Sequence, residues 1–460
     1  MSATEVQSVR TNARPALAPV IATASLGFVL VQLDVAIVNL ALARMGSALG
    51  AGVSGLQWVA DAYTVAFASL LLAAGWLGDR FGQRRAFEAG LVIFVLASLG
   101  CGLAPGLAAL IAARAAEGAG AALLVPCSLA LLRHETGADA GARTRAIGLW
   151  TAAGSAALAA GPIIGGMLVQ SVGWRAIFLV NLPLGAIGLC CSRRFLAETQ
   201  PARRGFDPAG QALAFLTLLA LAWAVIEAGP LGPTRPLVVG GAALAALGAI
   251  AFLLVEHRSA DPLLPLGFFR VGAFRTCSLV GLAVNASLYG ALFVLGLYLQ
   301  GTLGYGPAEA GLAFLPFAIA LGLANLAAAR LGRRFVRLGA TGAAMAAGLL
   351  LGAAGFWLLH RLGPGAAYPA LLPGLIAVPA GIGFAVPLMT SLLLAAVPPS
   401  RAGLAAGVLN TVRQAGGSVG IALAGSLFGA AGVGGMRAAF AGFSVLLAAA
   451  ALLAALGRKD

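Results

Sequence analysis

Apolar residues run through this chain in long blocks that short polar or Gly/Pro-rich breaks separate. A helix that crosses a bilayer needs about 20 apolar residues. Cutting the sequence at its breaks leaves fourteen blocks of about that size, and we therefore predict fourteen transmembrane helices. The predicted ranges are 17–42, 56–77, 86–104, 107–132, 146–169, 174–192, 209–226, 237–255, 276–299, 308–329, 340–359, 367–394, 402–428 and 438–456.

The composition agrees with a membrane protein. Hydrophobic residues make up 60% of the 460 positions and charged residues only 10%, whereas a soluble domain carries about 25% charged residues. The first apolar range is too long for a signal-peptide core of about 7 to 15 residues, so we interpret it as an uncleaved span. The fold class we expect is all-α: a polytopic membrane protein with 14 transmembrane helices.

The positive charges give an orientation. If the N-terminus is cytoplasmic, 22 of the 29 Lys and Arg residues fall in cytoplasmic segments, five fall outside and two lie within predicted spans. This bias follows the positive-inside rule and places both termini in the cytoplasm. Cytoplasmic loops facing anionic lipid also explain the formal charge of +14, so no nucleic-acid partner is expected.

An internal repeat divides the chain. Residues 72–85 align without gaps on residues 326–339, with seven of fourteen positions identical. The two copies lie eight spans apart, so two extra helices are expected between two six-helix bundles. The predicted divisions are a cytoplasmic tail (1–16), the first bundle (17–192), a cytoplasmic loop (193–208), two inserted helices (209–255), a second cytoplasmic loop (256–275), the second bundle (276–456) and a cytoplasmic tail (457–460).

Several motifs occur in order along the chain. The stretch "GWLGDRFGQRR" resembles the signature loop between the second and third helices of the major facilitator superfamily. "LIAARAAEGAG" resembles the family's fourth-span Arg segment, and "ALAAGPIIGG" resembles its fifth-span antiporter motif. "LDVAIVNLAL" and "GWRAIFLVNLPLG" are similar to the fourteen-helix drug:H+ antiporter branch. The resemblance implies a transporter that moves two bundles around a central site.

The signature loop concentrates charge in an apolar chain. Its glycines permit a tight turn and close helix approach, and Asp79 is placed to cap a facing helix or to meet Arg80. A cluster that only fixes topology would need the arginines but neither Asp79 nor the glycine spacing. The resemblance implies that the loop latches a cytoplasmic gate. The predicted gating residues are Gly75, Gly78, Asp79, Arg80, Gly82, Arg84 and Arg85.

A second motif lies in the fifth span. Pro162 removes a backbone donor, and the glycines leave a smooth face, so this helix can bend. Packing by small residues is the alternative. The resemblance assigns the motif to antiporters, which favours export over uptake. The predicted hinge residues are Gly161, Pro162, Gly165 and Gly166.

Charges inside apolar spans are costly and are therefore functional candidates. We expect two acids to lie well inside, Asp34 and Glu117, with Arg114 at the depth of Asp34 and on the same helical face as Glu117. A change in the separation of carboxylate and guanidinium can load or release a proton. We predict Asp34 as the proton-coupling acid, Arg114 as the group that tunes it, and Glu117 as a second titrating acid or a structural partner of Arg114. A static Asp34–Arg114 pair is the alternative.

Further polar residues lie in the predicted spans and can line a substrate cavity or form hydrogen bonds between helices. The predicted cavity residues are Asn39, Gln57, Trp58, Tyr63, Asn410, Arg413 and Gln414.

Together these features predict an exporter of the bacterial inner membrane that exchanges protons for lipophilic drugs or natural products. Arginine outnumbers lysine 28 to 1, which suggests a GC-rich bacterial genome. A proton-coupled metabolite transporter and a non-transporting membrane sensor are the alternatives. No enzymatic motif, catalytic residue, metal site or cofactor is expected; the partners are substrate, protons and membrane lipids, and the protein is expected to be monomeric.

Overall fold

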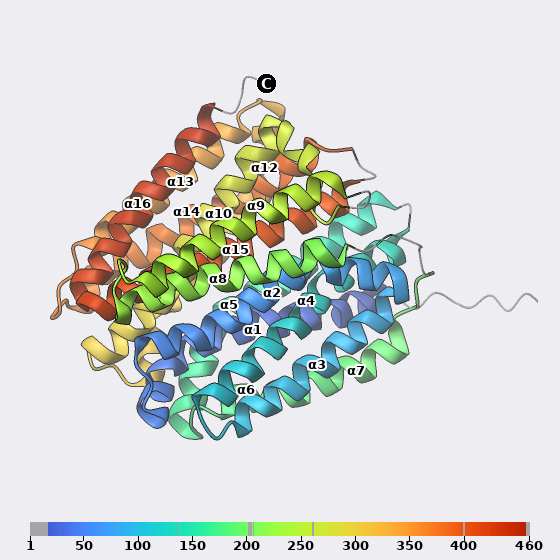
Figure 1. Cartoon of the computed structure of the whole chain (residues 1–460). Helices are drawn as coiled ribbons and strands as arrows, with labels where there is room; N and C mark the ends of the chain where they lie inside the picture. Colours follow the sequence, from blue (N-terminus) through green and yellow to red (C-terminus); the bar gives the residue numbers. More distant parts are fainter. Residues whose placement is uncertain are drawn as a thin grey trace, which may run out of the picture.

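The structure is a computed structural model that describes residues 17–137, 139–200, 205, 207–259, 262–398 and 401–456, and these residues form helices without strands (Figure 1). The predicted tails, 1–16 and 457–460, lie outside the described residues. The helices are α1 (Leu17–Leu49), α2 (Val53–Phe81), α3 (Gln83–Leu103), α4 (Leu107–Thr136), α5 (Ala140–Ser171), α6 (Ala176–Leu179), α7 (Asn181–Phe195), α8 (Pro208–Leu231), α9 (Pro236–Arg258), η1 (Leu266–Arg270), α10 (Gly272–Leu297), η2 (Tyr298–Thr302), α11 (Pro307–Ala313), α12 (Leu315–Arg337), α13 (Thr341–His360), α14 (Tyr368–Ala395), α15 (Ala402–Ala431) and α16 (Val433–Leu456).

Each predicted range coincides with a helix or a broken helix. The sixth range is divided into α6 and α7, and the tenth into α11 and α12, just before Pro316. The second range is bent by 54° between Val53–Leu71 and Ala73–Phe81. By contrast, α14 holds three internal prolines and continues as one helix, as membrane helices permit when neighbours satisfy the freed backbone groups.

Length and apolarity give fewer membrane crossings than the fourteen predicted. Within the described residues, twelve helices are long and apolar enough to cross a membrane, or thirteen if the bent α2 is one span. The remaining long helix, α15, contains Asn410, Arg413 and Gln414 in its apolar sequence. The chain is therefore an all-helical integral membrane protein, and fourteen crossings remain a prediction.

The two parts of the chain use the same packing scheme. In the first part α1 packs on α5, α3 on α4 and α2 on α4; in the second, α10 packs on α15, α13 on α14 and α12 on α14. The two parts contact each other where α2 packs against α15 and where α5 packs against α11 and α12. We refer to α1–α7 as the first half and α10–α16 as the second half.

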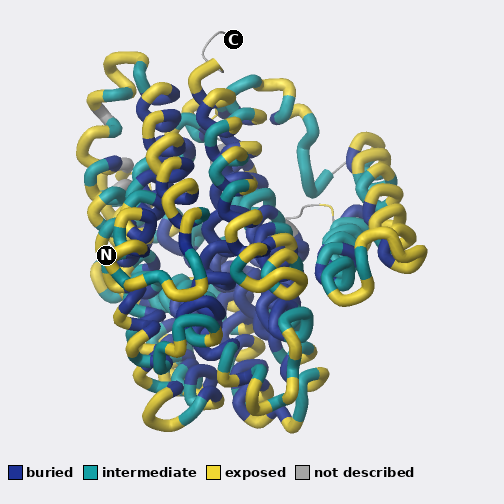
Figure 2. Tube along the Cα trace, turned by 90° about the vertical axis from the view of Figure 1, so that its left-hand side faces the viewer, coloured by how far each residue is buried: buried dark blue, intermediate teal, exposed yellow. Residues whose placement is uncertain are grey.

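The α8–α9 pair stands at one side of the molecule. It crosses the front of Figure 1 and forms the separate right-hand pair of Figure 2. The helix α8 contacts α2 and α15, one from each half, whereas α9 contacts mainly α8. In the most apolar 18 residues of α9 only 11% are buried, against 89% in those of the span formed by α10 and η2. Because exposed apolar surface of this extent is stable in lipid, α9 is suited to face the bilayer.

Candidate functional site

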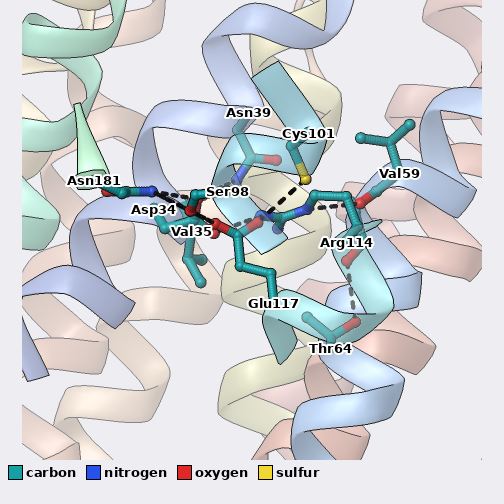
Figure 3. Close-up of polar contacts among 11 residues, drawn as sticks. Asp34, Val35, Asn39, Val59, Thr64, Ser98, Cys101, Arg114, Glu117 and Asn181 are labelled. Atoms are coloured by element: carbon teal, nitrogen blue, oxygen red, sulfur yellow. Dashed lines mark hydrogen bonds and ion pairs between the residues drawn. The ribbon is translucent and has the colours of Figure 1, made fainter. Parts of the chain in front are cut away.

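Arg114 on α4 is the centre of a buried charge cluster. Its Nη1 lies 2.6 Å from Asp34 Oδ2 on α1 and 2.6 Å from Glu117 Oε2, one turn along α4 (Figure 3). At most 1% of each residue is exposed. The structure thus brings together all three residues predicted for proton coupling.

The remaining contacts hold the guanidinium in place. Arg114 Nε donates to the backbone oxygen of Val59 on α2 at 3.2 Å. The Tyr63 ring centroid is 4.4 Å from Arg114 Cζ and the Phe178 centroid is 5.8 Å away. An aromatic face partly replaces the water that a buried cation loses. Tyr63, predicted to line a cavity, therefore belongs to the charge cluster instead.

Three residues that sequence reasoning did not single out complete the cluster. Asn181 Nδ2, at the start of α7, lies 3.2 Å from Ser98 Oγ and 3.5 Å from both Asp34 Oδ1 and Glu117 Oε1. Ser98 donates to Glu117 Oε1, and Cys101 Sγ lies 3.6 Å from Glu117 Oε2. Asn181 occurs in the quoted motif "GWRAIFLVNLPLG", where a polar residue among apolar neighbours was the available signal.

The charge balance of the cluster suits proton binding. Two carboxyl groups face one guanidinium, so the fully ionised cluster carries one excess negative charge. Isolated charge is costly in apolar surroundings. One proton on either carboxyl group makes the cluster neutral, and the arrangement is chemically able to hold one exchangeable proton.

One further acid corrects the sequence prediction that Asp34 and Glu117 are the acids well inside the spans. Asp61 on α2 is fully buried, with 0% exposure. Thr64 Oγ1 donates to Asp61 Oδ1 at 3.0 Å, while Oδ2 has no hydrogen-bond partner. The position lies inside the predicted range 56–77, so an inspection of every acid in that range would have found it.

Several predicted cavity residues join helices. Gln57 Nε2 donates to the Ala422 oxygen on α15 at 2.7 Å, and Trp58 Nε1 donates to Glu227 Oε1 on α8 at 3.2 Å. Asn39 instead lines a narrow, mostly apolar pocket between α1, α5, α10 and α12.

The second-half candidates lie on α15, where Asn410, Arg413 and Gln414 are half-buried. Arg413 Nε donates to Asn285 Oδ1 on α10 at 3.1 Å. The side-chain oxygen of Gln414 is buried without a hydrogen-bond partner. The half-buried Arg413 guanidinium forms no ion pair among the described residues, so it is a polar group available to a ligand.

The predicted gating loop is anchored within the first half. Gln83 Nε2 donates to Asp79 Oδ1 at 3.0 Å. Glu198, after α7, accepts from the backbone N–H groups of Arg84 and Arg85, at 3.1 Å each. A carboxylate at this end of α3 satisfies free amides and the helix dipole. Sequence reasoning missed Glu198, which lies 114 positions from Arg84.

The glycines of this loop differ in their surroundings. Gly82 has φ +99°, and a Cβ there would lie 2.3 Å from Glu198 Oε1. A Cβ on Gly78 would lie 2.3 Å from Gln83 Oε1, whereas one on Gly75 would meet open space. Arg80 is exposed. The tight turn is therefore at Gly82.

The predicted hinge residues of α5 lie in close helix contacts. A Cβ on Gly161 would lie 2.3 Å from Ala36 Cβ, and one on Gly165 would lie 3.1 Å from Ile37 Cα, both on α1. A Cβ on Gly166 would lie 2.4 Å from the Pro307 oxygen at the start of α11. The α5 helix is continuous through Pro162, so in this conformation the motif packs α5 against α1 within the first half and, at Gly166, against α11 of the second half.

The chain resembles known proteins along most of its length. A family model described as "Major Facilitator Superfamily" matches residues 24–421. The chain is 39% identical over 399 residues to the Methylenomycin A resistance protein of Streptomyces coelicolor, covering 87% of this chain and 83% of that protein.

Other relatives have names of the same kind. Multidrug resistance protein Stp of Mycobacterium tuberculosis is 36% identical over 422 residues, covering 91% of this chain and 76% of Stp. The Tetracenomycin C resistance and export protein of Streptomyces glaucescens is 34% identical over 414 residues, covering 89% of this chain and 75% of that protein. A solved structure of a peptide transporter POT matches with a TM-score of 0.71 and 16% identity, over 95% of this chain and 93% of that chain, which supports the fold alone.

Proposed function

The chain belongs to the major facilitator superfamily, and from that premise we propose that it is a proton-coupled antiporter that exports lipophilic drugs or natural products by alternating access. The names of its relatives, which include drug-resistance and export proteins, support export of such compounds. The observation that carries the coupling proposal is the buried cluster of Asp34, Arg114 and Glu117. We place the protein in the bacterial inner membrane, with both termini cytoplasmic.

Proton exchange at Asp34 is the proposed coupling step. When Asp34 is ionised, Arg114 is held between Asp34 and Glu117 at 2.6 Å from each. Protonation removes the charge of Asp34 and weakens its attraction to the guanidinium. Because Arg114 also contacts α2 through Val59 and Tyr63, its release changes the contact between α1, α2 and α4. Glu117 either keeps Arg114 in place during this step or takes up a second proton.

The contacts between the halves support alternating access. Gln57 donates to Ala422 O, and Gln300 Nε2 on η2 donates to Leu40 O at 2.8 Å. Gly166 packs against Pro307. All these groups lie in the parts of their helices that the predicted orientation places toward the outside. We infer that this arrangement has its outer side closed and that rocking of the halves opens it.

The proposed substrates are lipophilic molecules with at most one net positive charge. The pocket beside Asn39 is lined mainly by apolar and aromatic side chains, Phe314 and Phe317 among them. The intramembrane acids of the described residues lie in the first half, while the second half contributes Arg413. Substrate and proton are the partners, the proton gradient replaces a cofactor, and a monomer suffices for the cycle.

A susceptibility panel in an efflux-deficient bacterial host tests this proposal. We expect the wild-type chain to protect against part of the panel, and inverted vesicles to release protons when a protective compound is added. Asp34→Asn should abolish gradient-driven export. Asp139→Asn is the matched control, because Asp139 is exposed and caps α5 by accepting from Ala142 N, a bond that Asn can also make.

Two results would contradict the proposal in different ways. Full gradient-driven export by Asp34→Asn would remove Asp34 as the coupling acid while leaving export intact. A well-expressed wild-type protein that protects against no compound and moves none in vesicles would exclude drug export itself.

A further inference from the structure

A polar strip joins α2 to α15 near the outer end of the contact between the halves. Gln57 and Asp61 are four residues apart and share one face of α2. Opposite them, Ser418, Ala422 and Ser426 share one face of α15. Gln57 Nε2 lies 2.7 Å from Ala422 O and 3.3 Å from Ser426 Oγ, and Ser418 lies beside the Asp61 carboxyl group.

The helix α8 also contacts this strip. Ser426 Oγ donates to the Val225 oxygen on α8 at 2.7 Å, and Trp58, next to Gln57, donates to Glu227 at 3.2 Å. Three helices from three parts of the chain therefore meet here. Water is excluded from the Asp61 side chain as long as they stay together, since its exposure is 0%.

Asp61 has no counter-charge in this arrangement. The ion pairs within the described residues involve Arg84, Arg85 and Arg114, and Asp61 takes part in none of them. The ionisable side chains in the middle and outer half of the helices packed on α2 are Asp34 and Arg44 on α1, Cys101 on α3, Arg114 and Glu117 on α4, Glu227 on α8 and Arg413 on α15.

None of the three cations in this set forms an ion pair with Asp61. Arg114 pairs with Asp34 and Glu117, Arg44 is exposed at the outer end of α1, and Arg413 donates through Nε to Asn285. An ionised Asp61 would therefore be a buried charge without a partner, which costs several kcal/mol. A neutral acid carries its proton on one carboxyl oxygen, so a neutral Asp61 can donate a hydrogen bond as well as accept one beside the Ser418 hydroxyl.

We propose that Asp61 is a second proton-binding group that controls closure of the outer contact between the halves. While α2 and α15 are in contact, Asp61 is neutral. When they separate, water reaches the carboxyl group, its O–H bond breaks and the proton passes to the outer water. The resulting carboxylate opposes renewed contact, so closure requires a proton from outside. The inference rests on the proposed alternating access.

This role differs from that of Asp34. The Asp61 proton leaves to and returns from the same side, so it does not cross the membrane and adds nothing to the transport stoichiometry. Its effect is conditional: a transporter that has released its substrate outside closes again only after proton uptake. This requirement favours exchange of substrate for protons over a return of the empty transporter without proton uptake.

Distance measurements between spin labels test the proposal without any substrate or gradient. The labels are placed at Ser54 on α2 and Ala430 on α15 of the full-length protein, after substitution of the five native cysteines, in liposomes between about pH 5 and about pH 9. We expect the long-distance, open population to rise at least about tenfold with pH in the otherwise wild-type chain. Asp61→Asn should remain closed across the range, because an amide stays neutral.

Gln57→Ala is the matched control in the same strip. It removes a hydrogen bond between α2 and α15 but no ionisable group, so it should open the contact by a similar factor at every pH and leave the pH dependence in place. Asp34→Asn should also keep the pH dependence. Correct folding of each variant is checked by size-exclusion chromatography and thermal unfolding.

The outcomes separate this proposal from drug export. A pH dependence that persists in Asp61→Asn, or a wild-type distance that does not respond to pH, overturns the role of Asp61. Neither result depends on transport, so failure of the export assay leaves this test valid, and a flat pH response leaves the export proposal standing.

Discussion

At the scale of single residues, Asn181 connects the two buried acids. Its amide lies within 3.5 Å of oxygens from Asp34, Ser98 and Glu117. The residue begins α7 directly after the break at Val180, so the interruption of the sixth span places this side chain in the charge cluster. A break in a membrane helix is acceptable here because protein surrounds it.

Asn181→Ala should destabilise the protein by about 0.5–2 kcal/mol, because hydrogen bonds between membrane helices contribute about 0.6 kcal/mol on average and buried acceptors lose a donor. Thermal unfolding in detergent measures the change. We also expect slower gradient-driven export. Thr151→Ala is the control, since the Thr151 hydroxyl is exposed and bonds only within its own helix. Equal unfolding temperatures for both variants would contradict a supporting role for Asn181.

The sequence predicted contacts between buried charges where their depth in the membrane was enough to bring them together. Positions counted from the span ends placed Asp34 and Arg114 at one level, and the 2.6 Å contact is consistent with that count. Asp61 and Glu198 were missed for different reasons. Asp61 lay in an apolar range and was overlooked, whereas the partners of Glu198, Arg84 and Arg85, are more than a hundred positions away, and no local pattern reveals such a pairing.

At the scale of elements, one glycine on α5 and one on α11 bring the two halves into close contact. Gly166 lies against Pro307, and Gly311 on α11 lies against Pro162, where a Cβ would be 2.4 Å from the backbone oxygen in each case. Backbone atoms have little freedom to move aside. The α5–α11 contact therefore depends on both glycines.

Gly166→Ala should weaken the closed outer contact by about 1 kcal/mol or more, the usual range for overpacking, which shifts the equilibrium toward the open form at least about fivefold. Distances between labelled halves and export rates both report this shift. Gly148→Ala, in the same helix but facing open space, should leave both unchanged. Similar behaviour of the two variants would show that close packing at Gly166 is not limiting.

At the scale of the whole molecule, the duplicated packing scheme and the α8–α9 pair define the architecture. Corresponding helix pairs pack in both halves, and α8 contacts one helix of each. Insertion of α8 and α9 between two repeats stays a prediction from the sequence. The helix α8 also lies beside the outer contact, where Ser426 and Trp58 bond to it.

Fourteen crossings predict opposite locations for the two ends of α9. Thr234, in the exposed turn between α8 and α9, should lie outside, and Ser259 should lie in the cytoplasm. Single cysteines at these positions, in a chain without native cysteines, can be tested with a membrane-impermeant maleimide. We expect Thr234→Cys to react in intact cells and Ser259→Cys only after permeabilisation. The reverse pattern would exclude the proposed orientation.

The sequence by itself determined the class of protein, the position of nearly every helix and the identity of the main buried charges. Those properties depend on local hydropathy and on the cost of placing charge in an apolar medium, and both can be read directly from the order of residues. The tertiary structure decided which side chains meet. The rotation of each helix and its neighbours, set by packing across hundreds of positions, bring Asn181 to Asp34, Glu198 to α3 and Asp61 to Ser418.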